Sequence, residues 1–268
     1  MGATNLINRL YLGQLFVTAF QIIKKTWKNL LKIILLILAI ILLVSSLIYF
    51  IWQFLLSWQA ISIPLLFYLR IFLNILIYIA YFLIATIAQI LLIQQLLSPQ
   101  TKFKEIVSFT KKYFPHFLCL TIILNLLILT FTLPIYIGFF LIILKSYILG
   151  GAAIILGTTL LLFFAIYLVF SPFLLLEKNL SCWQAIKKSL KLTEGYFVDI
   201  LSKIVILALI IIFLNLLSVY LLAIPYIGLV LSAFIIILMI IFSFAYLTAM
   251  YQNFIANKNV PANNPQTI

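Results

Sequence analysis

Long apolar runs separated by short charged clusters form the main pattern of this chain. Five segments contain no Asp, Glu, Lys or Arg: residues 33–69, 71–101, 117–144, 146–176 and 204–257. A helix needs roughly 20 apolar residues to cross the hydrocarbon core of a bilayer, so several segments can hold one crossing and the last can hold two. The alternation of apolar and polar residues typical of a barrel strand is missing from the sequence, and lipid admits only helices or closed barrels. The pattern therefore predicts an all-α, polytopic membrane protein.

Six transmembrane helices fit this pattern, paired into three hairpins. We expect them at about residues 30–55, 66–96, 116–133, 148–174, 197–221 and 227–254. Pro64 lies in the first predicted hairpin, Pro134 and Gly138 in the second, and Pro225 and Gly228 in the third. Proline fixes φ and glycine tolerates unusual backbone angles, so both residues favour tight turns at these places.

A short motif recurs ahead of each predicted hairpin. The pattern [ST]-x-[FW]-[QK]-x-I begins at Thr18, Thr101 and Ser181, and lysines and an aromatic residue follow each copy. Recurrence at similar spacing predicts three units, each an amphipathic interfacial helix followed by a two-helix hairpin. An even number of crossings per unit makes the units parallel. Their expected bounds are about 5–97, 98–176 and 177–257, within one six-span domain over residues 1–257, and residues 258–268 form a short polar tail.

Composition and charge refine this architecture. The chain of 268 residues is 67% hydrophobic and 8% charged, with a formal net charge of +13, whereas a soluble domain is about 25% charged. All of the 17 Lys and Arg residues except Arg70 and Lys145 fall on one side of the six predicted spans. The positive-inside rule places that side, with both termini, in the cytoplasm, and we expect a bacterial inner-membrane protein. Because the lysines are dispersed along a membrane face, we expect no nucleic-acid partner.

The third copy of the motif reads "SCWQAIKKSL" over residues 181–190. Ser181 with Gln184 matches a capping box, so a helix is expected to start there, and Gly195 is a suitable stop. Trp183, Ile186 and Leu190 are expected to form its apolar face. Such a helix is too short and too charged to cross the bilayer, so it would lie in the interface.

The lysines of these interfacial helices have two interpretations. They could bind anionic lipid headgroups, or they could only set the topology while the apolar face packs against the bundle. The second interpretation is favoured, because the positive-inside rule alone accounts for them. The candidates for headgroup contact are Lys24, Lys25, Lys111, Lys112, Lys187, Lys188 and Lys191.

The stretch "SPFLLLEKNLSCWQAIKKSLKLTEGYFVDIL" (171–201) resembles the membrane domain attached to some bacterial glycerophosphoryl diester phosphodiesterases. It is also similar to related free-standing inner-membrane proteins that are uncharacterised. The resemblance covers most of the chain in layout and implies a six-span plan without an activity to transfer. In the fused proteins the phosphodiesterase chemistry belongs to a separate soluble barrel, which we do not expect here, because about a dozen residues follow the last predicted span.

Few residues offer chemistry inside the predicted membrane region. Asp199 and Lys203 are four positions apart on one predicted helix, where they can pair. Arg70, with Asn74 one turn later, lies near the outer end of the second span. An intramembrane arginine is often functional, although one near a helix end can extend to the headgroups, and the structural role is favoured for both sets.

Other features of the sequence indicate packing. Ala153 and Gly157 form a pair of small residues in the fourth span, which favours close helix packing. The two cysteines, Cys119 and Cys182, are expected to be inert thiols on the cytoplasmic side. No catalytic, cofactor-binding or metal-binding residues are expected, because the sequence contains no nucleophile with a base, no phosphate loop and no metal-ligand spacing.

The sequence thus favours an integral membrane protein that is not an enzyme and has a structural, lipid-interacting or partner-binding role. Its expected partners are membrane lipids, with anionic lipids as an open option, and a membrane or peripheral protein as a further option; no oligomeric state follows from the sequence. The alternative is a transporter or a lipid-translocating protein, in which Arg70, Asn74, Asp199 and Lys203 contribute to a polar path.

Overall fold

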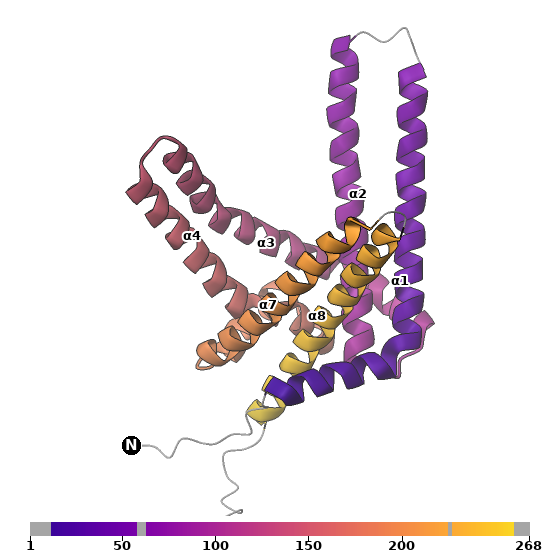
Figure 1. Cartoon of the computed structure of the whole chain (residues 1–268). Coiled ribbons are helices and arrows are strands. Elements are labelled where there is room, and N and C mark those ends of the chain that lie inside the picture. Colours follow the sequence, from indigo (N-terminus) through magenta and orange to yellow (C-terminus); the bar gives the residue numbers. More distant parts are fainter. Residues whose placement is uncertain (1–11, 58–62, 225–226, 260–268) are drawn as a thin grey trace, which may run out of the picture. The chain divides into compact units, whose positions relative to one another are not determined.

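A computed structural model describes residues 12–57, 63–224 and 227–259 of the chain. The described residues contain eight α-helices and no strand (Figure 1). The helices are α1 (Leu12–Ser57), α2 (Ile63–Leu97), α3 (Phe103–Ile143), α4 (Tyr147–Leu168), α5 (Ser171–Lys178), α6 (Cys182–Thr193), α7 (Phe197–Leu222) and α8 (Gly228–Asn259). Among them are six stretches that are long and apolar enough to cross a membrane, with α4 and α5 counted as one. The chain is therefore an all-α, polytopic membrane protein, as the hydrophobic pattern predicts.

The chain divides into two compact units. One unit comprises residues 1–25 and 119–268, and the other comprises residues 26–118. The helices α1 and α3 each contribute residues to both units. The two units do not test the predicted division of the sequence into three repeats, which stays a prediction.

The three copies of the motif differ in how they join the long apolar helices. Helix α1 runs without a break through the first copy, α3 begins at Phe103 within the second copy and continues without a break, and the third copy forms the separate helix α6. In α1, the side chains of Leu15, Ala19 and Ile22 are buried at helical spacing. Phe16, next to them, stacks on Phe242 of α8 in the same unit. One face of α1 at the first copy of the motif therefore lies on the protein core.

The turn between α3 and α4 corrects one prediction. Pro134 and Gly138 lie inside α3, and the turn is made by residues 144–146. Lys145 takes a left-handed conformation (φ 65°), its N–H donates to the Ile142 carbonyl, and the Ser146 N–H donates to the Leu141 carbonyl. This hydrogen-bond pattern ends helices without requiring a proline. Proline is tolerated in transmembrane helices because neighbouring groups satisfy the freed backbone atoms.

Gly138 instead lies where the backbones of α3 and α4 approach each other closely. A β-carbon added at Gly138 would lie 2.7 Å from the Gly150 carbonyl oxygen, and one added at Gly150 would lie 2.7 Å from the Gly138 carbonyl oxygen. At Gly157, an added β-carbon would lie 2.6 Å from Cγ1 of Ile135. These three glycines, which we call the glycine seam, let two helices pack backbone to backbone.

The fourth span is broken near its end, which the sequence interpretation missed. Helix α4 stops at Leu168, and α5 begins at Ser171 with Pro172 in its first turn. Pro172 has no N–H to give to the carbonyl four residues earlier. That carbonyl, on Leu168, accepts from the Ser171 hydroxyl at 2.6 Å. The side chain before the proline thus replaces the lost backbone hydrogen bond.

Helices α7 and α8 lie side by side as a hairpin (Figure 1). The hydroxyls of Ser218 and Ser232 lie 2.6 Å apart between them and are buried. One turn away, the Asn215 amide donates to the Met239 sulfur at 3.4 Å. Polar contacts of this kind hold helices together in lipid, where apolar burial gives little drive.

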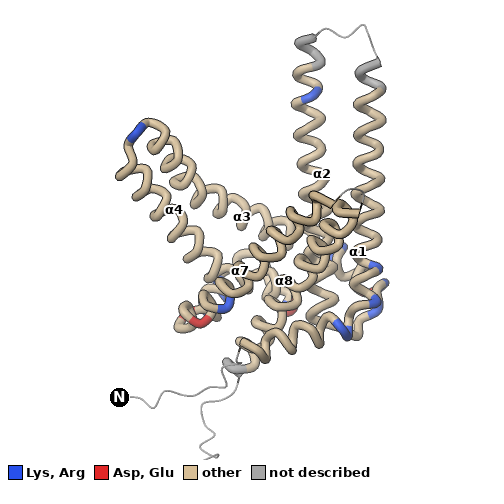
Figure 2. Tube along the Cα trace, in the orientation of Figure 1, with Lys and Arg blue, Asp and Glu red and all other residues tan. Residues whose placement is uncertain are grey.

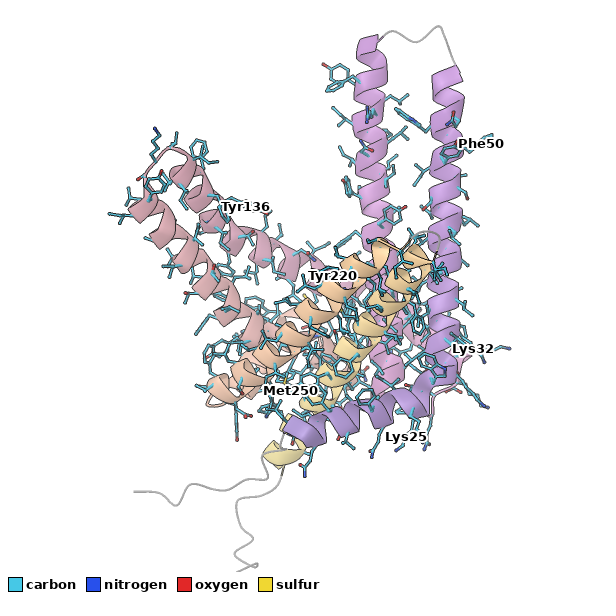
Figure 3. All side chains as sticks on the ribbon, viewed as in Figure 1. Lys25, Lys32, Phe50, Tyr136, Tyr220 and Met250 are labelled. Atoms are coloured by element: carbon cyan, nitrogen blue, oxygen red, sulfur yellow. The ribbon has the colours of Figure 1, made fainter. Side chains whose placement is uncertain are left out.

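Aromatic residues of α5 and α8 build the core of this unit. Phe170, which precedes α5, and Phe173 both pack against the ring of Tyr251, and all three side chains are buried. Elsewhere, large apolar side chains such as Phe50, Tyr136 and Tyr220 point away from the ribbons and are exposed (Figure 3). On a surface that faces lipid, exposure of such side chains has no hydrophobic cost, because the lipid tails are equally apolar.

Candidate functional site

Helix α6 is held in place at its start by the predicted capping box. The Gln184 N–H donates to the Ser181 hydroxyl at 3.4 Å, and the Ser181 N–H donates to the Gln184 side-chain oxygen at 3.3 Å. Each contact satisfies a backbone or side-chain group that would otherwise have no partner at the helix start. The helix ends before Gly195, whose φ of +83° favours glycine. Both boundary predictions are confirmed.

One face of α6 packs on α4 and α5. Its buried side chains are those of Ala185, Ile186, Ser189, Leu192 and Thr193. The Ser189 hydroxyl donates to the Tyr167 carbonyl of α4 at 2.7 Å, one of the carbonyls that the end of α4 leaves without a helical partner. The break in the fourth span is therefore the docking point of α6.

The predicted apolar face of α6 is partly corrected. Ile186 is buried, but 58% of Trp183 and 38% of Leu190 are exposed. The core-facing side of the helix is rotated toward Ala185 and Ser189, because the Ser189 hydroxyl binds the Tyr167 carbonyl there. Trp183 lies beside the buried face of α6 and is exposed, so its amphipathic ring is able to contact lipid headgroups.

The outward side of α6 is basic. Lys187, Lys188 and Lys191 are all exposed, and the Lys187 ammonium lies 5.6 Å from the centre of the Trp183 ring. This cation–π contact places an aromatic ring and a positive charge at one point of the surface. Together, Trp183, Lys187, Lys188 and Lys191 are called the α6 basic face below.

The other candidate lysines lie on α1 and α3. Lys24, Lys25, Lys111 and Lys112 are exposed, and the Lys112 ammonium lies 5.2 Å from the ring centre of its neighbour Tyr113. Lys111 and Lys112 belong to the unit of residues 26–118, whereas the α6 basic face belongs to the other unit. Figure 2 shows that charged residues occur in short clusters and that long stretches of the helices carry none.

Asp199 and Lys203 form the predicted pair. The Lys203 ammonium donates to the Asp199 carboxylate at 2.6 Å. It also lies 5.1 Å from the ring centre of Phe254, and the Tyr246 hydroxyl donates to the Lys203 carbonyl at 3.2 Å. Lys203 is buried while Asp199 is partly exposed. The pair joins the first turns of α7 to the last turns of α8.

A second contact between distant residues was not predicted. The Tyr251 hydroxyl of α8 donates to the Glu177 carboxylate at the end of α5. Tyr251 is fully buried and Glu177 is exposed. Glu177 lies within residues 171–201, the segment that carries the family resemblance. No spacing pattern in the sequence predicts its contact with a tyrosine 74 positions later.

Arg70 and Asn74 line a small cavity in the hairpin of α1 and α2. The cavity is about 250 Å³ and is otherwise lined by Ile48, Trp52, Leu73 and Ile77. The Arg70 guanidinium lies 5.7 Å from the centre of the Trp52 ring, a cation–π contact. Arg70 and Asn74 are thus together, as their spacing predicts, in the unit of residues 26–118, and Asp199 and Lys203 are in the other unit.

The largest change from the sequence interpretation concerns the cysteines. The sulfurs of Cys119 in α3 and Cys182 in α6 lie 3.0 Å apart. Both are free thiols; Cys119 is exposed and Cys182 is half-buried. They are 63 positions apart in the chain, and no local pattern indicated this proximity.

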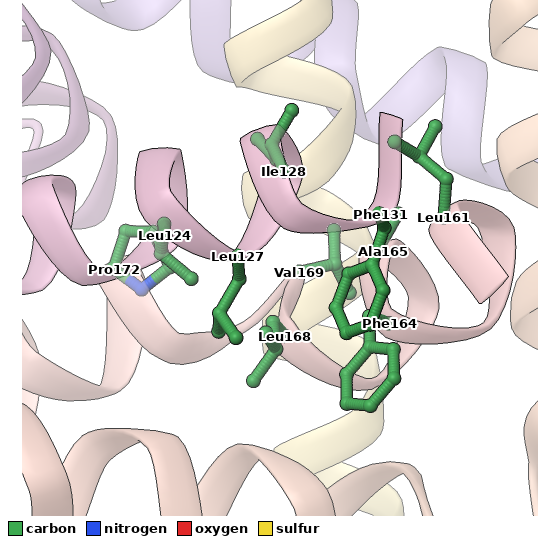
Figure 4. A pocket seen from close by; sticks show the side chains of 10 residues that line it. All are labelled: Leu124, Leu127, Ile128, Phe131, Leu161, Phe164, Ala165, Leu168, Val169 and Pro172. Atoms are coloured by element: carbon green, nitrogen blue, oxygen red, sulfur yellow. The ribbon is translucent and has the colours of Figure 1, made fainter. Parts of the chain in front are cut away.

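Two further cavities in the larger unit are apolar. One, of about 300 Å³, lies between α3 and the broken fourth span (Figure 4). Its lining is Leu124, Leu127, Ile128, Phe131, Leu161, Phe164, Ala165, Leu168, Val169 and Pro172. The other, of about 410 Å³, lies between the start of α1 and the hairpin of α7 and α8. No side chain in either lining can donate a proton, attack a substrate or bind a metal, so both fit hydrocarbon only.

Among the residues that the structure describes, no three His, Cys, Asp or Glu side chains gather as metal ligands. Compared with protein-family models, curated proteins and solved structures, the chain finds no match.

Proposed function

We propose that this integral membrane protein is a non-catalytic component of the bacterial inner membrane that binds anionic lipid headgroups through the α6 basic face. The observation that carries the proposal is the way α6 packs on the neighbouring helices. Its buried face is fixed to α4 and α5 by the hydrogen bond from Ser189 to the Tyr167 carbonyl, while Lys187, Lys188 and Lys191 remain exposed beside Trp183. A helix fixed in this way presents its charges without an additional ordering cost.

The binding free energy of the α6 basic face is expected to favour an anionic lipid surface over a neutral one. Each basic residue near an anionic membrane surface contributes about 1 kcal/mol of binding free energy, and a tryptophan prefers the headgroup depth. A helix whose only role was to set the topology would need the lysines but no fixed position for them. The fixed position supports lipid recognition over the topology-only interpretation that the sequence favours.

The test replaces the charges of the α6 basic face. We expect the triple variant K187Q/K188Q/K191Q to lose most of its preference for phosphatidylglycerol over phosphatidylcholine, by about tenfold or more at low salt, since three contributions of about 1 kcal/mol disappear. The measurement is quenching of tryptophan fluorescence by brominated forms of each lipid in reconstituted vesicles, with Trp183→Phe to isolate the signal of that residue.

Two controls give the result its meaning. K187R/K188R/K191R keeps the charges and should keep the preference, and Lys145→Gln, which removes one cation from the turn between α3 and α4, should leave it unchanged. Equal quenching by both lipids in the wild-type protein at low salt would overturn the proposal, because surface charge interactions are strongest there.

The location and relationships of the protein belong to the same proposal. We place both termini and the α6 basic face in the cytoplasm, because the positive-inside rule orients helical membrane proteins in this way. We also propose kinship with the membrane domain of glycerophosphoryl diester phosphodiesterases, supported by residues 171–201, which make up α5, α6 and the start of α7. A membrane or peripheral protein partner is an additional expectation, which cross-linking in native membranes would test.

A transporter or lipid-translocating role is the second candidate. The Arg70 and Asn74 cavity favours it, because a charged side chain lines a space in a hairpin that is otherwise apolar. The Asp199–Lys203 pair argues for a structural role instead, since each charge is neutralised by the other. Reconstituted vesicles decide the matter: wild-type protein that moves neither solute nor labelled lipid excludes this candidate.

A further inference from the structure

We propose that Cys119 and Cys182 form a reversible disulfide, a redox modification site that joins α3 to α6. The proposal concerns the thiols alone and does not depend on lipid binding. The two sulfurs lie 3.0 Å apart, and a disulfide bond is about 2.05 Å long. The sulfurs therefore need to approach by only about 1 Å, which small rotations of the two side chains supply.

The packing of helices that are distant in the sequence brings these two thiols together. They are the only two cysteines in the 268-residue sequence, and they come from helices that are separated by α4 and α5 in the chain. Cys182 is the first residue of α6, directly after the capping residue Ser181, so the capping box fixes its backbone. Docking of α6 on α4 and α5 through the Ser189 contact then fixes the position of the whole helix.

Neither thiol is enclosed by the protein. Cys119 is exposed, and Cys182 is half-buried at the start of α6. The side chains of the protein therefore do not shield this pair from a small disulfide, as they would shield a buried pair. Two thiols are also all that a disulfide requires, while a metal site needs further ligands, and none gather here among the described residues.

The reaction is a thiol–disulfide exchange with a small-molecule disulfide. The thiolate of one cysteine attacks a sulfur of the small disulfide, which releases one small thiolate and leaves a mixed disulfide. The second cysteine, as its thiolate, then attacks the protein sulfur of that mixed disulfide and releases the other small thiolate. The two protons lost by the protein go to the two released thiolates, so two protein thiols are oxidised while one small disulfide is reduced.

The product would tie α6 to α3 covalently. In the reduced protein α6 is held to α4 and α5 by a hydrogen bond and a buried face, all of which can open. The disulfide would close a loop that contains all of α4 and α5. Oxidation would therefore add a covalent link between α6 and α3, and reduction would leave α6 held by the noncovalent contacts alone.

The experiment uses the full-length wild-type protein in reconstituted vesicles. After exposure to glutathione disulfide, free thiols are counted with a maleimide–polyethylene glycol reagent under denaturation. We expect the count to fall from two per chain to none, and to return after dithiothreitol. Intact-mass measurement should show the loss of two hydrogen atoms and no added glutathione, and the rate should not depend on protein concentration.

The single variants separate the possible results. Cys119→Ser and Cys182→Ser should each accept one glutathione and form no intramolecular link. The proposal is overturned if the wild type retains two free thiols, carries glutathione on both cysteines, or forms only covalent dimers. Each of these results comes from the wild-type protein, so none depends on the folding of a variant.

Discussion

The absence of a β-carbon at single glycine positions allows α3 and α4 to pack closely. A β-carbon at Gly150 would lie 2.6 Å from Cγ1 of Ile142 and 2.7 Å from the Gly138 carbonyl oxygen, closer than real contacts allow. The neighbouring Gly151 has open space at the same place. Two adjacent glycines of one helix thus have opposite roles, and only Gly150 belongs to the glycine seam.

This contrast predicts a difference between two otherwise identical substitutions. Gly150→Val should destabilise the protein by about 1–3 kcal/mol, the usual cost of overpacking, because the helix backbones must separate. Gly151→Val should be close to neutral, since its side chain would point into open space. Thermal unfolding in detergent, followed by circular dichroism, measures both variants, and equal losses of stability would show that the glycine seam has no special role.

Separation in the sequence explains which residue pairs could be predicted. Asp199 and Lys203 were identified because four positions on a helix bring side chains together. The Glu177–Tyr251 hydrogen bond and the Cys119–Cys182 contact span 74 and 63 positions. Such contacts depend on how helices pack, and the hydrophobic pattern carries little information about which faces of the long helices meet, because those helices are apolar over most of their surface.

At the scale of elements, α6 and the broken fourth span form one structure. The end of α4 leaves carbonyls without helical partners, and hydroxyls from two different helices satisfy them: Ser171 binds the Leu168 carbonyl and Ser189 binds the Tyr167 carbonyl. The sequence predicted the capping box because it is local. It did not predict the break, since proline inside an apolar run does not by itself end a transmembrane helix.

Removing the Ser189 hydroxyl should therefore loosen α6. Ser189→Ala leaves the Tyr167 carbonyl without this buried donor, which costs about 1–3 kcal/mol. Protection of the α6 amides from hydrogen exchange should fall in this variant. Ser202→Ala is the matched control, because the Ser202 hydroxyl donates to a carbonyl of its own helix and is exposed. The same protection in both variants would mean that the buried apolar side chains alone hold α6.

At the scale of the whole molecule, the six crossings were predictable and their arrangement was not. The length and apolar character of each run are enough to identify a transmembrane helix, and the structure contains all six. The turn at residues 144–146 was misplaced because Pro134 and Gly138 resemble turn residues, although they lie within α3. In lipid, these residue types mark close helix contacts and tolerated kinks as often as turns.

Orientation is the whole-molecule property that the charge pattern predicts most directly. In the unit of residues 1–25 and 119–268, Lys145 and Lys178 lie at opposite ends of the span that runs from Tyr147 to Lys178. With Cys119 and Cys182 replaced by Ser, Lys145→Cys should react with an impermeant maleimide added to intact cells, and Lys178→Cys only after permeabilisation. Each substitution exchanges one exposed lysine for a cysteine and keeps a β-carbon, so neither adds strain at the turn. The reverse labelling order would show that the positive-inside rule fails for this chain, and would place the α6 basic face outside the cytoplasm.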